Sequence, residues 1–155
     1  MKSKNEAFIA LSALCAASEQ CEHKLREKLQ RWEITGDAAD HIIARLYDDR
    51  YLDESRFASA YARDKLRYNQ WGRVKIAEAL RLLRISPEVI QDACALLPEE
   101  EYQDILRSLL RGKLRTVKAK SEYERRGKLI RFALGRGFEM PLVMSCLSDV
   151  PEEDD

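Results

Sequence analysis

Few residues in this sequence could carry out covalent or metal chemistry. The histidines are His23 and His41, and Cys21 lies two positions before the first of them. A zinc site needs a second pair of ligands at a matching spacing, and the sequence offers none. No serine stands in a nucleophile elbow, and no glycine-rich loop is placed to cradle a phosphate. The adjacent carboxylates Asp48 and Asp49 are typical of a solvated helix end. We therefore expect no catalytic residue, no metal and no cofactor.

Basic side chains are the functional groups that this sequence does gather. Two segments, 63–84 and 107–136, are rich in lysine and arginine and contain few carboxylates. Such groups displace the counterions condensed on nucleic acid and bind it with little sequence preference. Under a shift of 48 residues the basic positions in 63–67 match those in 111–115, so the same end of a helix is basic twice. We predict a DNA- or partner-binding set made of Arg63, Lys65, Arg67, Arg73, Lys75, Arg111, Lys113, Arg115, Arg125, Arg126, Lys128 and Arg131.

A second interpretation of these basic segments stays open, because helices often carry solvated cations and ion pairs on their outer faces. Trp71, between Arg67 and Arg73, is either a platform for a nucleic-acid base or a packing residue at a joint between modules. Lys and Arg together number 27, as do Asp and Glu, so the net charge is zero. Binding to nucleic acid would therefore depend on local patches rather than on the field of the whole protein.

Helices must position these groups, because apolar residues recur with helical spacing throughout the chain. Buried-type positions also repeat: Leu25 is matched by Ile76 after 51 residues and by Leu129 after a further 53. We expect nine helices, at Lys4–Ala17, Glu22–Trp32, Asp37–Arg50, Glu54–Tyr68, Arg73–Arg84, Pro87–Leu97, Glu99–Thr116, Glu122–Gly135 and Met140–Leu147. Asp37, Asp53 and Ser86 are the predicted caps of three of them.

The predicted fold class is all-α, with three tandem three-helix repeats that form an elongated, curved molecule. The repeats span residues 4–52, 53–98 and 99–148, and an acidic tail follows at 149–155. Each repeat is too small to bury much surface alone, so neighbours are expected to complete one another's cores. The tail either solvates the end of the chain or contacts a basic surface.

The N-terminal residues and the cysteines predict the cellular compartment of the protein. The chain has no apolar signal sequence and no stretch of about 18 apolar residues, as a membrane span requires. Cys94 and Cys146 fall on the repeated apolar stripe and are expected in the core. We expect reduced thiols and a cytoplasmic protein that does not contact a membrane.

Three segments resemble the RecX family, whose members regulate the RecA recombinase. Residues 53–65 read DESRFASAYARDK and resemble that family's D-(E/D)-x-R-F-A-x-A-(Y/F)-x-R-x-(K/R) signature. Residues 71–76 read WGRVKI, and residues 128–138 read KLIRFALGRGF; both are similar to further family patterns. The chain departs from the family at Cys21, where serine often caps the second helix, and at Gly135, where arginine is common.

The resemblance implies a regulatory protein with no catalytic centre. It would bind the RecA-type recombinase filament on single- and double-stranded DNA, without sequence preference and as a monomer, and would inhibit ATP hydrolysis and strand exchange. End capping, occupation of the filament groove and disassembly remain open as mechanisms. Two other functions also remain open: a helical DNA-binding transcription regulator, and an adaptor that binds only proteins.

Overall fold

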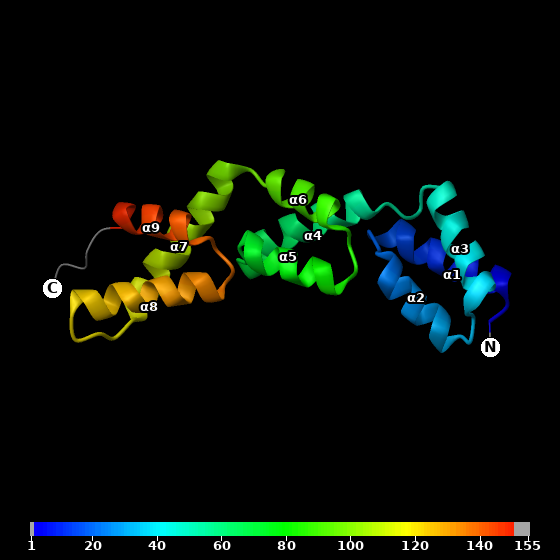
Figure 1. The fold of residues 1–155 in the computed structure, drawn as a ribbon, viewed down its shortest axis with the longest axis horizontal. Helices are drawn as coiled ribbons and strands as arrows, with labels where there is room; N and C mark the ends of the chain where they lie inside the picture. Colours follow the sequence, from blue (N-terminus) through cyan, green and yellow to red (C-terminus); the bar gives the residue numbers. More distant parts are fainter. Residues whose placement is uncertain (1, 151–155) are drawn as a thin grey trace. The chain divides into compact units, whose positions relative to one another are not determined.

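The computed structural model describes residues 2–150, and all the regular secondary structure in that range is helical (Figure 1). No strand occurs among these residues, which confirms the all-α prediction. The helices are α1 (Lys4–Ala17), α2 (Glu22–Arg31), α3 (Gly36–Asp48), α4 (Glu54–Asn69), α5 (Arg73–Leu82), α6 (Pro87–Ala95), α7 (Glu99–Thr116), α8 (Glu122–Gly135) and α9 (Met140–Asp149). We call α1–α3 the first module, α4–α6 the second and α7–α9 the third.

Side-chain caps explain where several helices begin. Ser3 and Glu6 form a reciprocal capping box at α1, with the Ser3 hydroxyl accepting from the Glu6 amide at 3.1 Å. The Asp53 carboxylate accepts from the Arg56 amide at 3.0 Å, so the predicted cap of α4 is confirmed. Cys21 precedes α2 and makes no capping hydrogen bond through its side chain, in line with its departure from serine.

Ser86 caps α6 as predicted, because its hydroxyl accepts from the Val89 amide at 3.4 Å. The prediction for Asp37 is wrong: Thr35 holds the capping position, and Gly36 is already the first residue of α3. Asp37 therefore lies in the first turn, where its charge favours the positive end of the helix dipole.

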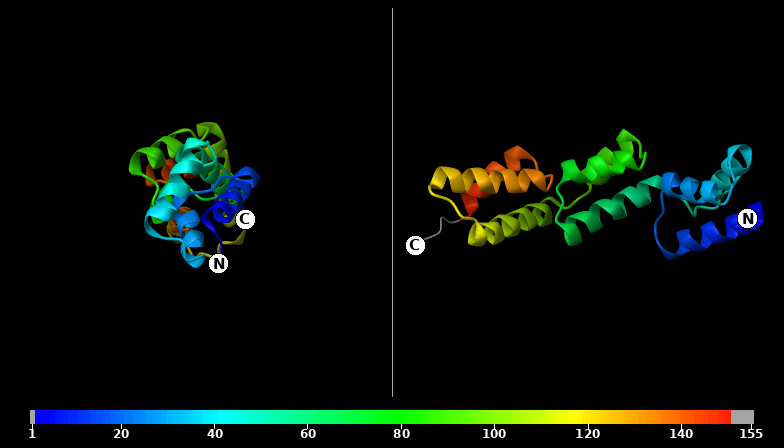
Figure 2. Two further views of the ribbon diagram at one scale, coloured as in Figure 1. Left: turned by 90° about the vertical axis from the view of Figure 1, so that its right-hand side faces the viewer. Right: turned by 90° about the horizontal axis from the view of Figure 1, so that it is seen from below.

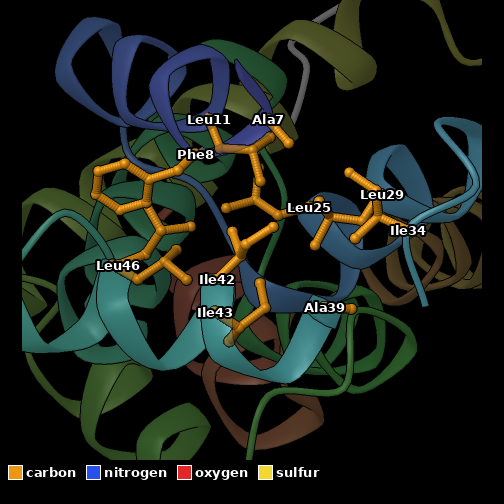
Figure 3. Packing of buried hydrophobic residues seen from close by; sticks show 11 residues of the cluster. Ala7, Phe8, Leu11, Leu25, Leu29, Ile34, Ala39, Ile42, Ile43 and Leu46 are labelled. Atoms are coloured by element: carbon orange, nitrogen blue, oxygen red, sulfur yellow. The ribbon is translucent and has the colours of Figure 1, made fainter. Parts of the chain in front are cut away.

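The first module has an apolar core drawn from all three of its helices (Figure 3). Leu25 and Leu29 are one turn apart on α2, and both are fully buried. Helix α3 packs against both α1 and α2. Its side chains Ile42, Ile43 and Leu46 belong to this core.

The third module is built on the same plan around its longest helix, α7 (Figure 2). Tyr102, Leu106 and Leu110 recur every four residues along α7 and are all fully buried. Helix α7 packs against α8 and α9, and those two helices also pack against each other. Cys94 and Cys146 are both buried, as the repeated apolar stripe predicts.

The positions that match under the shifts of 51 and 53 residues are buried in every module. Leu25, Ile76 and Leu129 are at most 4% exposed. Two compact units divide the chain: one takes in residues up to Ala60 together with Leu80–Ile90, and the other takes in Tyr61–Ala79 together with the chain from Gln91. The module boundaries at 4–52, 53–98 and 99–148 and the elongated, curved shape stay predictions, and most of the acidic tail lies outside the described residues.

Candidate nucleic-acid interface

All twelve predicted binding residues lie in the same compact unit, the one that contains Tyr61–Ala79 and the chain from Gln91. They occupy four stretches of helix: the end of α4, the start of α5, the end of α7 and the middle of α8. The structure gives them four different environments, which distinguish residues bound within the fold from residues that face solvent.

Arg73 belongs to the interior of this unit. Its guanidinium donates to Glu139 at 2.9 Å, to Glu99 at 2.6 Å and to the Cys94 carbonyl at 3.2 Å. The same group stacks on the Tyr102 ring, 3.9 Å from its centroid, and the side chain is only 20% exposed. Arg73 therefore joins α5 to α7 and to the residue that precedes α9, and its hydrogen-bonding capacity is largely used within the protein.

Tyr102 and Glu139 complete this cluster, and sequence reasoning missed both of them. The Tyr102 hydroxyl donates to the Glu139 carboxylate and accepts from the Arg73 amide at 2.9 Å. Burial, and then the hydrogen bond to Glu139, raise the pKa of Tyr102, so the phenol keeps its proton. On α7 the tyrosine occupies an ordinary core position, so its spacing gave no signal of a polar role.

The start of α5 lies directly against the turn between α8 and α9. The Gly72 amide donates to the Arg136 carbonyl at 2.8 Å, and the Val74 amide donates to the Gly137 carbonyl at 3.0 Å. A Cβ atom on Gly72 would collide with the backbone of Gly137, which itself has a φ of +94°. We call this contact the glycine clasp. No local sequence pattern predicted this contact.

Three other predicted residues form ion pairs within the unit, among them Lys128, which binds Glu124 at 3.2 Å, and Arg125, which is only 22% exposed. Arg67 binds Glu101 at 3.1 Å, and Arg125 binds Glu122 at 2.9 Å. Such pairs contribute little to stability, typically below about 1 kcal/mol, so a polyanion can compete for these cations at small cost.

Three lysines lie over aromatic rings. The Nζ atoms of Lys65 and Lys75 are each 4.8 Å from the centroid of the Trp71 ring, and Lys113 Nζ is 5.1 Å from that of Phe132. These distances fit cation–π interactions, which leave the ammonium protons free to bind an anion. Trp71 is half-buried beneath its two lysines.

The remaining arginines face solvent. Arg63, Arg111, Arg115 and Arg126 are exposed, and their side chains form no hydrogen bond or ion pair with any residue in the range 2–150. Arg131 is exposed as well. These residues carry the positive charge that the fold itself does not use.

Two kinds of site are missing from the described part of the chain. Within residues 2–150 no group of three or more His, Cys, Asp or Glu side chains is arranged to hold a metal ion. No helix in that range combines the length and the apolar character that a membrane crossing needs.

Sequence and structure comparisons identify similar proteins along nearly the whole chain. The Regulatory protein RecX of Bacillus cytotoxicus is 23% identical over 150 residues, which cover 97% of this chain and 56% of that protein. The Regulatory protein RecX of Halalkalibacterium halodurans is 28% identical over 130 residues, which cover 83% of this chain and 48% of that protein. The chain thus spans about half the length of these curated relatives.

A solved structure has the same fold. The crystal structure of RecX from Lactobacillus salivarius superposes with a TM-score of 0.86 and 17% sequence identity, covering 95% of this chain and 96% of its own. The patterns described as the second and third three-helix domains of RecX match residues 53–93 and 99–147, together more than half of the sequence. The chain therefore belongs to the RecX family.

Proposed function

We propose that this protein regulates a RecA-type recombinase by binding its filament on DNA, and that it has no catalytic activity of its own. In this role it inhibits the ATPase and strand exchange of the recombinase and thereby modulates recombination and DNA repair. It acts in the cytoplasm as a monomer, without a cofactor. The relatives support the regulatory part of the proposal, since they are named regulatory proteins.

The observation that carries the DNA contact is the set of exposed arginines without partners in the described chain. Arg63 on α4 and Arg111 on α7 occupy corresponding helix positions, so two successive modules present the same unpaired charge. Core packing does not require this repetition, whereas a binding face that follows a long polyanion would produce it. Because Arg73 is held by Glu99 and Glu139, we leave it out of the proposed contact surface.

A recombinase assay tests the regulatory role directly. The protein is titrated into the DNA-dependent ATPase reaction of the recombinase from the same organism. We expect ATP hydrolysis to slow as the protein is added, and strand exchange to slow with it. Unchanged hydrolysis at saturating protein would contradict the proposal.

A pair of charge reversals tests the surface. Arg63→Glu combined with Arg111→Glu should weaken both DNA retention and inhibition, because it replaces two attractive charges with repulsive ones. The matched control is Lys24→Glu with Arg31→Glu, which reverses two exposed charges on α2 of the first module. Equal losses in both variants would show that total charge matters rather than this surface. Binding that prefers one duplex sequence over scrambled duplexes would favour a transcription regulator instead.

A further inference from the structure

A pair of lysines meets at one aromatic ring in the second module. Lys65 is near the end of α4 and Lys75 is in the first turn of α5, ten residues along the chain. Their ammonium groups lie at the same distance from the Trp71 centroid, 4.8 Å. Neither lysine forms an ion pair with a residue that the structure describes. Both charges therefore lie near the same ring, and neither forms an ion pair with a carboxylate in the described part of the chain.

The third module has lysines at the corresponding positions, and one of them lies over an aromatic ring. The shift of 48 residues that relates α4 to α7 takes Lys65 to Lys113, and the shift of 53 that relates α5 to α8 takes Lys75 to Lys128. Lys113 lies over Phe132, and both lysines line a pocket of about 460 Å³ between the end of α7 and α8. Lys118, Arg131, Thr116 and Val117 complete its lining together with Phe132, so no carboxylate lines the pocket.

The first module lacks the pair. The shift of 51 residues that takes Ala7 to Ala58 places Leu14 where the second module has Lys65. Leu14 packs against the apolar core of the first module, so only one lysine, Lys24, remains at the corresponding positions. The paired arrangement is thus confined to the second and third modules.

Helix electrostatics alone does not explain these lysines. Lys113 suits the negative end of the α7 dipole, but Lys75 lies in the first turn of α5, where a cation is unfavourable. Lys128 has a partner, since it binds Glu124 at 3.2 Å and donates to the Lys118 carbonyl at 2.5 Å. The net charge around the third-module pocket is nevertheless positive. Glu124 is a single carboxylate beside the pocket, whereas four cations line it: Lys113, Lys118, Lys128 and Arg131.

We propose that each lysine pair binds a phosphate of a nucleic-acid backbone, so that the second and third modules each hold the strand at one point. This inference rests on the proposed contact with DNA and assigns residues to it. Lysine binds phosphate as a point charge, and arginine can bind both carboxylates and phosphates bidentately. In this chain arginines do bind carboxylates, as Arg67 and Arg73 show, and the repeated pairs are lysines. A partner with regularly spaced charge also matches a site that recurs from module to module.

The test measures affinity for fluorescent oligothymidylate over a series of salt concentrations. The variants are Lys65→Gln with Lys75→Gln and, separately, Lys113→Gln with Lys128→Gln. Losing the one phosphate contact of a pair should make the slope of log affinity against log salt shallower by about 0.7, and should weaken binding roughly 5-fold near 0.1 M salt. The matched control, Lys24→Gln with Lys28→Gln on α2, removes the same charge outside the pairs and should leave the slope unchanged.

Further measurements identify the ligand and check that the variants are folded. Replacing the same lysines with arginine keeps the charge and should restore the salt slope, while circular dichroism checks that each glutamine variant is folded. Equal slopes in the paired variants and in the wild type would overturn the proposal. So would variants that bind DNA normally but no longer bind the recombinase without DNA, since the lysines would then contact protein carboxylates. If the wild type binds DNA through these pairs yet fails to slow the recombinase ATPase, the proposed function fails and the lysine assignment stands.

Discussion

Tyr102 shows how one buried hydroxyl can serve both packing and polar contacts at the centre of a unit. Its ring packs against Phe138, with centroids 5.2 Å apart, while its hydroxyl bridges Glu139 and the Arg73 amide. Tyr102→Phe keeps the ring and removes the bridge, which leaves a carboxylate and an amide with one hydrogen bond fewer. We expect the free energy of unfolding to fall by about 1–3 kcal/mol, measured by urea denaturation.

The control for that experiment is Tyr123→Phe. Tyr123 is 89% exposed, and its hydroxyl forms no hydrogen bond with any residue in the range 2–150. That variant should leave the unfolding midpoint unchanged. Equal midpoints for Tyr102→Phe and the wild type would mean that water replaces the lost hydroxyl at no cost.

Glu54, the first residue of α4, is a half-buried carboxylate that makes stability depend on pH. Its Oε1 atom accepts from the Tyr47 hydroxyl at 3.1 Å, while Oε2 is buried without a hydrogen-bond partner. Burial raises the pKa of Glu54 above its usual value of 4.5, although the Tyr47 hydrogen bond acts in the opposite direction. Protonated Glu54 is thus favoured by the fold, and ionising it costs stability.

The sign of the resulting pH effect follows from linkage. Below pH 4.5 the carboxyl group is protonated in both the folded and the unfolded state, so its favourable contribution is fully present. That contribution is lost as the pH rises through the higher folded-state pKa. Compared with Glu54→Gln, which cannot ionise, the wild type should lose stability as the pH rises above 4.5. Parallel unfolding curves at each pH check this; a constant difference between the two proteins would contradict it.

At the scale of elements, the glycine clasp holds the start of α5 against the turn between α8 and α9. Gly137→Ala adds a Cβ atom that meets Lys75, at a φ of +94° where L-residues are strained. We expect a loss of at least 2 kcal/mol, because steric overlap adds to a conformational cost of about 1 kcal/mol. Thermal unfolding followed by circular dichroism measures it.

Gly112 in the middle of α7 is the matched control, since a Cβ atom there meets nothing within 4 Å. Alanine is the better helix former by about 1 kcal/mol, so Gly112→Ala should raise the melting temperature. Destabilisation by both substitutions would show that the clasp is no tighter than an ordinary helix surface.

The elements also show what a sequence can reveal and what it cannot. Leu25, Ile76 and Leu129 identify the repeated core because burial constrains apolar side chains to helical spacing. The cluster of Arg73, Glu99 and Glu139 joins positions as far as 66 residues apart, and no local pattern marks such a contact. For the same reason Arg73 was grouped with exposed cations on its charge alone, while the exposed Arg63 and Arg111 follow directly from the helix repeat.

For the molecule as a whole, equal numbers of acidic and basic residues make DNA binding a property of local surface. If the two lysine pairs supply two phosphate contacts, raising salt fourfold should weaken binding to a single strand by roughly 7-fold through these contacts. Titrations of oligothymidylate at 50 and 200 mM salt measure this change. An affinity that hardly responds to salt would mean that apolar or hydrogen-bonding contacts dominate instead.

The clasp also bears on how far sequences of this fold can diverge. Its hydrogen bonds run from main-chain amides to main-chain carbonyls, and Arg136 adds a side-chain donor to the Asn69 carbonyl at 2.5 Å. A contact made by main-chain atoms requires almost no particular side chain nearby, except that two positions must lack a Cβ atom. Mutations can therefore accumulate around it freely, and homologues as distant as 17% identity should still share glycine at the positions of Gly72 and Gly137.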